Sequence, residues 1–308
     1  MKYYFDNESS ISRRKFLQSL STVMILAGSA NSLLSSCTKK KKVIVGAHPW
    51  VYAATQPKND IYTILDNIFA DMKYAGMDGI ELMHTALRPP DAVERISLLS
   101  DKHQLAIIGT SFSGRMWDRT RHDAIMSDAE LVITNLAKLG GRTLGTSVGN
   151  ARGTKTEEQL DNQAELLQKI ISLCEANEVV LNLHNHTYEV ENDMHDLRGT
   201  LARIPNVKLG PDINWMIRGG VNPVQFIKQY GDRIVFLHLR DQKADGTWSE
   251  AMGEGDTDFV SIAQALNEIH FAGEAVVELA FESDFSPTRP IRESLKISRE
   301  FVRDIFGY

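Results

Sequence analysis

Short apolar runs alternate with longer stretches in which apolar residues recur every three or four positions, from residue 43 to the end of the chain. Such short runs are typical of strands buried on both faces of a parallel sheet, and the longer spacing is typical of amphipathic helices. The predicted strands are Val43–Ala47, Gly79–Leu82, Leu105–Gly109, Arg142–Thr146, Val179–His184, Val207–Gly210, Ile234–His238 and Ala275–Leu279. The predicted helices lie near residues 60–75, 90–103, 122–139, 156–176, 193–203, 222–230, 258–270 and 288–306.

Helix-capping residues support these boundaries. Thr156 stands before a periodic stretch and has Gln159 three residues later, which is the spacing of a capping box, and Asp60 is a second predicted N-cap. Three glycines follow predicted helices where a left-handed C-cap residue is favoured: Gly76, Gly140 and Gly273. Helix, cap and strand therefore follow one another regularly.

Eight strand–helix units in a region of this length predict an α/β fold, a single-domain (β/α)8 TIM barrel over residues 43–308. The alternative is a doubly wound open sheet, which usually carries a glycine-rich phosphate loop after an early strand. No G-x-G-x-x-G or Walker sequence stands at a strand-to-helix turn, and the fragment Gly253-Glu254-Gly255 belongs to a late loop. The pattern favours the barrel.

Residues 1–36 precede the strand–helix pattern and are typical of an export signal. The pair Arg13-Arg14 precedes an apolar stretch that is too short and too interrupted to span a membrane. The pair resembles the twin-arginine export motif, and Leu34-Ser35-Ser36-Cys37 resembles a bacterial lipobox. We expect an exported, periplasmic protein, lipid-anchored at Cys37, with residues 37–42 as a basic tether. An ordinary amphipathic leader with an incidental cysteine is the alternative.

Composition excludes several classes of protein. The 308 residues are 43% apolar with a net charge of −6, so the chain is neither disordered nor typical of nucleic-acid binding. Two cysteines exclude a disulfide scaffold and a multi-cysteine zinc site. Cys174 lies in an apolar run and is expected to be an inert buried thiol.

Ligand-type side chains gather at the predicted strand ends, where a TIM barrel builds its active site. Strands two, five, six, seven and eight end at or near Glu81, His184, Asp212, His238 and Glu278. A lone His or Asp there is more often a rim or capping residue. A Glu inside an apolar strand is harder to explain, because a buried carboxylate is costly without a partner. The joint pattern predicts a divalent-metal site.

His186 and Glu189 stand beside this set. His184 and His186 share one face of an extended strand, and only one of them need bind metal. The nitrogen and oxygen ligands suit Mn²⁺, Co²⁺, Zn²⁺ or Mg²⁺. The donor set does not choose among these four ions.

These residues resemble those of the xylose-isomerase-like TIM-barrel superfamily, also called the sugar phosphate isomerase/epimerase family. The resemblance covers essentially the whole chain after residue 42. It is sharpest in the segments 183–190, similar to an H-N-H-x-x-E block in one branch, and 233–241, similar to R-I-x-x-x-H-x-K-D. The resemblance implies one divalent metal ion, for which Mn²⁺ is expected ahead of Co²⁺, Zn²⁺ and Mg²⁺. This ion would be held by Asp212, His238, Glu278 and a strand-five group, either His184 or Glu189.

Three departures from the family pattern matter. His184 stands where many members have Glu, and Trp215 stands where many have the His of D-x-x-H, so a second metal ion is not expected. Arg240 replaces a family Lys. Since Arg keeps its proton at neutral pH, we expect it to clamp a substrate oxygen. The missing His and the acidic net charge argue against the DNA-repair branch.

The resemblance implies proton transfer next to a sugar carbonyl through a metal-stabilised enediolate. Glu278 and Glu189 are the expected base and conjugate acid, with His186 as a further catalytic residue. Glu81, Trp215 and Arg240 are expected to contact the substrate, and Glu81 is equally well read as an anchor for neighbouring loops. The long loop 241–258 is a candidate lid that would stack on a sugar ring; a plain surface loop is the alternative.

The predicted function is a metal-dependent sugar isomerase or epimerase. The alternative is a metal-dependent lyase or dehydratase that eliminates a β-substituent from 3-oxo-glycosides or keto-polyols. A non-catalytic sugar-binding lipoprotein is a third possibility. Export, and the absence of an Arg/Lys cluster beside a strand-end glycine motif, favour an unphosphorylated sugar or keto-sugar.

The expected partner is a small carbohydrate, with no nucleic acid and with membrane contact only through the lipid anchor. The sequence favours no oligomeric state.

Overall fold

The predicted apolar runs form eight parallel strands in the computed structural model, which describes residues 42–282 and 285–308. Their neighbours in the sheet follow the order β6-β5-β4-β3-β2-β1-β8-β7. The strands are β1 Ile44–Ala47, β2 Gly79–Met83, β3 Ala106–Ser113, β4 Thr143–Ser147, β5 Val180–Leu183, β6 Lys208–Leu209, β7 Phe236–Leu239 and β8 Glu274–Val277.

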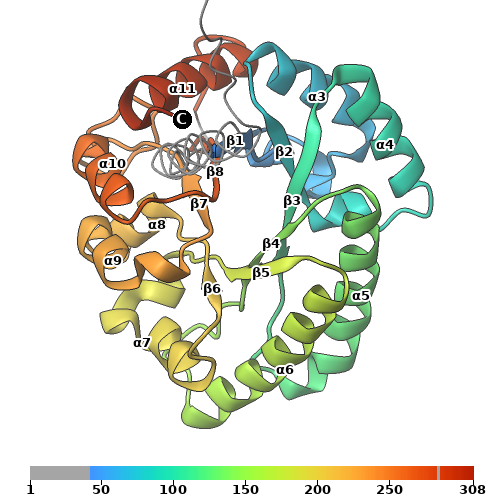
Figure 1. The fold of residues 1–308 in the computed structure, drawn as a ribbon, viewed down its shortest axis with the longest axis vertical. Coiled ribbons are helices and arrows are strands. Elements are labelled where there is room, and N and C mark those ends of the chain that lie inside the picture. The colour runs from blue at the N-terminus through green and yellow to red at the C-terminus, as the bar shows by residue number, and fades with distance from the viewer. Residues whose placement is uncertain (1–41, 283–284) are drawn as a thin grey trace, which may run out of the picture. The chain divides into compact units, whose positions relative to one another are not determined.

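The sheet curls into a nearly closed barrel, and the helices surround it (Figure 1). The last gap, between β6 and β7, is joined by two isolated parallel bridges, Leu209 to Ile234 and Asp212 to His238. The second bridge already places two predicted metal ligands side by side. The described residues thus confirm the predicted TIM barrel and its single-domain architecture.

Ten α-helices are present among the described residues, most of them between successive strands. They are α2 Trp50–Ala53, α3 Leu65–Tyr74, α4 Ala92–His103, α5 His122–Lys138, α6 Glu157–Ala176, α7 Thr187–Arg203, α8 Ile213–Arg218, α9 Pro223–Tyr230, α10 Phe259–Glu268 and α11 Ile291–Phe306. Their apolar faces pack against the outside of the barrel in one large hydrophobic core.

Several predicted boundaries are wrong, each for a local reason. The third strand extends four residues beyond Gly109, because its backbone continues to pair with β4 as far as Ser113. The first long helix begins at Leu65, because two 3₁₀ turns precede it, and Asp60 instead accepts a hydrogen bond from the Tyr62 amide at 2.9 Å. Helix α7 begins six residues earlier than predicted and breaks at residues 191–194.

The capping predictions hold at most positions. Thr156 and Gln159 form the predicted capping box at the start of α6. Gly76 and Gly140 take the left-handed conformation, with φ of 80° and 83°. Gly273 does not: His270 is the left-handed residue there, and a Cβ on Gly273 would lie 2.0 Å from the Val235 carbonyl oxygen. Gly273 is therefore required by close backbone contact.

A bulge in β3 sets which side chains face the barrel interior. Ile80 pairs with Ile107, but the next residue, Glu81, pairs with Gly109, so β3 carries one extra residue. Ile108 packs inside the barrel with Phe236 and Val276. After the bulge, Ser111 and Ser113 lie on the same strand face as Gly109, towards the carboxyl ends of the strands.

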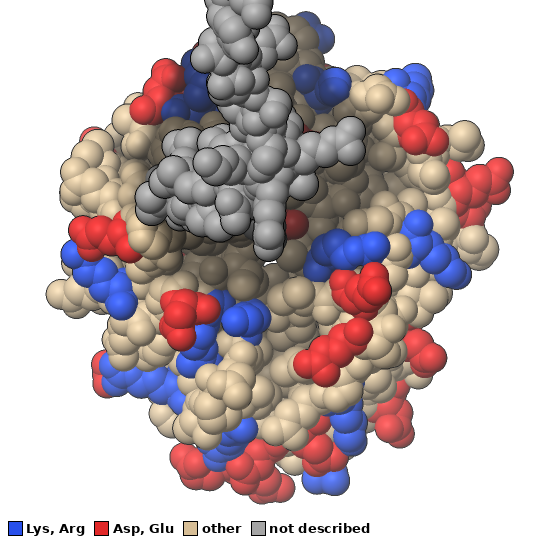
Figure 2. Space-filling model, in the orientation of Figure 1, with Lys and Arg blue, Asp and Glu red and all other residues tan. Residues whose placement is uncertain are grey.

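The predicted export signal, Cys37 and residues 37–41 of the basic tether lie outside the described residues. Among the helices that are described, none combines the length and apolar character that a membrane crossing requires. Lys and Arg side chains are interspersed with Asp and Glu over the face that Figure 2 shows.

Candidate active site

The carboxyl ends of β5, β6 and β7 bring three ligand-type side chains together. His184, Asp212 and His238 each offer one ligand atom, and these atoms lie within 4.8 Å of one another. Asp212 also begins α8, where its Oδ1 accepts the amide hydrogens of Asn214 and Trp215 at 3.1 and 3.0 Å. One carboxylate therefore caps a helix and faces the two histidines.

The donor types in this set suit a divalent cation, and one of the donor atoms is unpaired. The Nδ1 atom of His184 is buried and has no hydrogen-bond partner among the described residues. Burial, together with the neighbouring His238 and His186, holds the pKa of His184 well below its usual range, so its imidazole is neutral. The neutral imidazole of His184 and the carboxylate of Asp212 are ligands that Mn²⁺ and Zn²⁺ accept, and a set of three protein ligands leaves coordination positions open.

Glu81 orients His238 from inside the barrel. Its Oε2 lies 2.5 Å from Nε2 of His238, and the residue is fully buried. Burial lowers the pKa of His238, but the charges of Glu81 and Glu278 outweigh this and raise it to about 10. A carboxylate behind an imidazole is the usual partner of a metal-binding histidine. The structure places Glu81 against this histidine.

Glu278 lies at the centre of a charged cluster. One of its oxygens is 3.2 Å from Nδ1 of His48, and the other is 3.1 Å from Nδ1 of His238. The same oxygen accepts a hydrogen bond from Nη2 of Arg240. Burial opposes ionisation, but Arg240, His238 and His48 hold the pKa of Glu278 well below its usual range. The carboxylate is therefore ionised.

Arg240 joins the two carboxylates of the site. Its Nη2 donates to Oδ2 of Asp212 at 2.6 Å and to Glu278. Its guanidinium also lies 5.5 Å from the ring centre of Trp215 and 5.0 Å from that of Trp248. Arg240 thus supplies a fixed positive charge between Asp212 and Glu278.

His186 and Trp215 border the cluster. The His186 ring stacks on Tyr188 with ring centres 5.2 Å apart and lies 5.9 Å from Trp215. Burial lowers the pKa of His186, but Glu189 outweighs this and raises it. Its side chain keeps 37% of its surface exposed, so it remains accessible to a ligand.

Glu189 belongs to a neighbouring network. Its Oε1 accepts from the Ser147 hydroxyl at 2.6 Å and from the Val148 amide at 3.3 Å, and its Oε2 accepts from the His186 amide at 2.7 Å. The Glu189 side chain therefore caps the start of α7 and links this helix to the end of β4. The structure does not bring Glu189 into the His184–Asp212–His238 group.

The loop 241–258 is fastened to its own first residue. Asp241 accepts hydrogen bonds from the amides of Gly253, Gly255 and Thr257 at 3.0, 2.9 and 3.3 Å. Trp248 is 9% exposed and meets Trp215 edge-on at 5.2 Å. The loop therefore supplies a packed wall beside Arg240.

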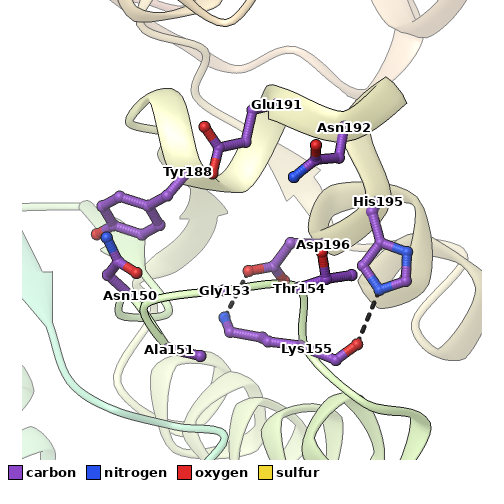
Figure 3. A pocket seen from close by; sticks show the side chains of 10 residues that line it. All are labelled: Asn150, Ala151, Gly153, Thr154, Lys155, Tyr188, Glu191, Asn192, His195 and Asp196. Carbon is purple, nitrogen blue, oxygen red and sulfur yellow. Dashed lines mark hydrogen bonds and ion pairs between the residues drawn. The ribbon is translucent and has the colours of Figure 1, made fainter.

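A small cavity lies behind Tyr188, between the loop after β4 and α7 (Figure 3). Lys155 and Asp196 form a buried ion pair there at 2.5 Å, and Nε2 of His195 lies 2.9 Å from the Lys155 carbonyl oxygen. The free volume is about 10 Å³, room for about one water molecule. This region supports α7 and offers no space for a sugar.

Comparison with known families now identifies the barrel. Residues 69–301 match the family described as xylose isomerase-like TIM barrel. The chain belongs to this family. The family prediction from the strand-end motifs is thereby confirmed, whereas the H-N-H-x-x-E branch and the export signal stay predictions.

Proteins similar to this xylose isomerase-like chain include a dehydratase of inosose and several sugar epimerases. Inosose dehydratase of Clostridium tetani is 21% identical over 299 residues, which cover 86% of this chain and 98% of the dehydratase. D-allulose 3-epimerase from Methylomonas sp. has a TM-score of 0.68 at 18% identity, over 86% of this chain and 98% of that one. The 3-keto-D-glucoside 4-epimerase from E. coli has a TM-score of 0.66 at 18% identity, over 84% of this chain and 100% of that one. The structural likenesses establish the fold.

The sequence-based prediction of this xylose isomerase-like site missed His48 and Ser111. His48 follows the first strand and its Nε2 lies 3.0 Å from the Ser111 hydroxyl. The signal was available, because His48 stands at a strand end as the other site histidines do. Trp248 belongs to the loop 241–258, the predicted lid, and its edge-on contact with Trp215 becomes evident only in the tertiary structure.

Proposed function

We propose that this protein is a divalent-metal-dependent enzyme that removes a proton next to the carbonyl of a sugar or keto-sugar, with isomerisation or epimerisation as the outcome. The observation that carries this proposal is the cluster of His184, Asp212, His238 and Glu278 at the mouth of a xylose isomerase-like barrel. The sugar epimerases with similar folds and the dehydratase relatives support sugar chemistry at this mouth.

His184, Asp212 and His238 would hold the cation, Mn²⁺ in the first instance, with Glu278 as a further ligand or as the base. When bound, such a cation supplies Lewis-acid polarisation of a substrate oxygen. Arg240 adds a fixed positive charge next to the same carboxylates, so negative charge that develops on the substrate is stabilised from both sides.

Glu278 is the proposed proton acceptor. It is ionised, and its Oε1 lies 3.2 Å from His48, away from the oxygen that Arg240 binds. A carboxylate with a lowered pKa is a weak base, so it can deprotonate carbon only where the resulting negative charge is strongly stabilised. Arg240 and the cation are placed to do this.

β-Elimination is the second candidate, and two observations favour it. The sequence relatives are named inosose dehydratase. In addition, Glu189 is tied up as a cap, whereas the accessible His186 has a raised pKa and can hold a proton for a leaving hydroxyl or alkoxide. In this version Glu278 removes the proton and His186 protonates the leaving oxygen.

Deuterium exchange separates these outcomes. The full protein, loaded with Mn²⁺ in D₂O, is followed by proton NMR against keto-sugars, keto-polyols and 3-oxo-glycosides. Deuterium in an intact skeleton establishes an isomerase or epimerase, and release of water or aglycone establishes a lyase. Binding without exchange for every member of the panel would contradict both and support a sugar-binding protein.

Metal binding is tested directly by elemental analysis after dialysis. We expect Asp212→Asn and His238→Ala to lose bound Mn²⁺, while Asp232→Asn, an exposed aspartate elsewhere on the barrel, retains it. Retention of metal by both site variants would refute the proposed ligand set.

The proposed location is the periplasm, with a lipid anchor at Cys37. The twin-arginine motif and the lipobox support it. Labelling of the full chain with radioactive palmitate in bacterial cells, compared with Cys37→Ser, tests it: equal label in both proteins would exclude lipidation at this residue.

A further inference from the structure

Three arginines from different parts of the chain line one cavity at the carboxyl end of β3. Arg88 follows β2, Arg115 follows β3, and Arg121 precedes α5. The cavity has a volume of about 300 Å³ and is also lined by Ser113 and Asp128. This volume accommodates a sugar substituent or part of a sugar ring.

The charges around this cavity do not balance. Arg88 is satisfied by a two-pronged pair with Asp128, at 2.8 and 2.7 Å. Among residues 42–282 and 285–308, Arg121 has only a long contact of 3.6 Å with Asp118, whose other oxygen accepts from the Thr120 hydroxyl at 2.6 Å. Arg115 makes no side-chain hydrogen bond or ion pair within the described part of the chain. One guanidinium is therefore free, and a second is weakly paired.

The backbone that carries Arg115 is held firmly. The Gly114 amide donates to the Ser147 carbonyl at 3.3 Å, and the Met116 amide donates to the Val148 carbonyl at 3.1 Å. The Met116 carbonyl oxygen in turn lies 2.9 Å from Nε2 of His122. Arg115 thus projects from a fixed turn, which lowers the entropic cost of binding a ligand there.

The cavity adjoins the active site through β3. Ser111 contacts His48 at 3.0 Å, and His48 lies 3.2 Å from Glu278. Ser113 is two residues further along the same strand face, about 7 Å away at the usual rise of a strand. A group at the cavity can therefore be part of the molecule that reacts beside Glu278.

We propose that this cavity binds an oxyanion carried by the substrate, so that the enzyme acts on acidic sugars. Paired guanidinium donors match the geometry of carboxylate, sulfate and phosphate, which share this chemistry. The inference rests on the proposed function, because it places the reacting carbon at Glu278. It also corrects a premise of the sequence analysis: an arginine cluster does stand beside a strand-end glycine, Gly114.

Binding of unreactive glycosides tests the proposal without turnover. Calorimetry on the full protein compares methyl glucoside with its uronate, 6-sulfate and 6-phosphate forms. We expect at least one acidic glycoside to bind about tenfold more tightly than the neutral one, the usual effect of one charged hydrogen bond. The rank order among the three identifies the oxyanion.

Variants then locate the effect. Arg115→Ala should remove most of this preference and Arg121→Ala part of it, whereas Arg303→Ala, an exposed arginine on α11 paired with its neighbour Asp304, should retain it. Thermal unfolding of each variant establishes that it is folded. Equal affinity of the wild-type protein for all four glycosides, no measurable binding of any, or an unchanged preference in Arg115→Ala would overturn the proposal.

These outcomes are distinct from those of the proposed function. Deuterium exchange on neutral keto-sugars without any preference for acidic glycosides would overturn the oxyanion site alone. A preference that depends on Arg115, without exchange on any substrate, would overturn the proposed reaction and leave the binding site.

Discussion

Two buried polar clusters lie near the ends of the strands, and they differ in how completely their atoms are paired. In the first, Nζ of Lys155 donates to Gln163 and Asp196, and the Gln163 amide donates to Asp196 and to Thr200 (Figure 3 shows the Lys155–Asp196 pair). In the second, which extends from the barrel interior to its mouth, the atoms without a hydrogen-bond partner in the described structure are His184 Nδ1, Arg240 Nε, Glu81 Oε1 and both amide atoms of Asn182.

This difference separates support from function. A buried polar group without a partner costs about 1–3 kcal/mol, and a folded protein keeps such groups where a ligand, ion or water completes them. The Lys155 cluster is complete without any ligand, so it stabilises the fold. The mouth cluster is incomplete in the protein alone, which is expected of a site that binds something.

The largest expected effect is on catalysis at the mouth. Glu278→Gln should slow deuterium exchange by about 10²–10⁴-fold, because it removes the proposed proton acceptor. Glu282→Gln, an exposed glutamate four residues later, is the matched control and should exchange normally. Wild-type exchange in Glu278→Gln would show that the base is another residue.

The complete cluster should instead respond in stability. Lys155→Met leaves Asp196 buried without its cation and should lower the free energy of unfolding by about 3–5 kcal/mol. Replacing both partners, Lys155→Met with Asp196→Leu, should recover most of this loss, because no unpaired charge remains. Urea unfolding measures both.

The rate of deuterium exchange into the substrate, per folded molecule, should stay at the wild-type level in Lys155→Met. If the single variant were as stable as the wild type but inactive, the proposed division between the two clusters would be wrong.

The free energy of unfolding should also depend on pH through His84, which follows β2. Burial, with the nearby charge of Arg88, lowers the pKa of His84 from 6.5 to about 4. The unfolded chain therefore binds this proton between pH 6.5 and 4 while the folded protein does not, so stability is complete above this range and falls as pH falls. The loss amounts to about 3 kcal/mol.

Urea unfolding of the wild type and of His84→Gln between pH 7.5 and 4.5 measures this term. The difference between the two proteins should change across that range and level off at its upper end. A constant difference would mean that His84 titrates normally in the folded protein.

The smallest expected effect on stability is at Asn192, beside the Lys155 cluster. Asn192 has φ of 52° in the break of α7, where a side chain is strained, so Asn192→Gly should raise the free energy of unfolding by about 0.5–1 kcal/mol. Asn177→Gly is the matched control: its φ is −106°, and the same change should destabilise. Destabilisation at both positions would show that the Asn192 side chain makes contacts that matter more than its backbone strain.

Much of the site could be predicted from strand ends alone. His184, Asp212 and His238 lie where the apolar runs stop, and parallel strands bring their carboxyl ends to one edge of the barrel. The roles of neighbouring residues could not be predicted in this way. Glu189 stands three residues after His186, which suits a helix cap as well as a catalytic acid, and only its contacts with Ser147 and Val148 distinguish the two.

The arginine cavity illustrates the same limit. Arg115 and Arg121 lie in one loop after Gly114, but Arg88 comes before α4 and β3, so no local pattern joins all three. Their convergence depends on the packing of α5 beside the end of β3 and on the turn at residues 114–116, which hydrogen bonds hold against residues 147–148.

By itself, the sequence determined the eight strand–helix units, the barrel and the strand-end residues of the site, because apolar periodicity and capping are local properties of the chain. Only the tertiary structure decided that Arg240 joins Asp212 to Glu278, that Glu81 supports His238, and that three arginines share one cavity. Such pairings depend on distances between side chains from different strands. Those distances are set by sheet register, bulges and closure of the barrel, which no single segment encodes.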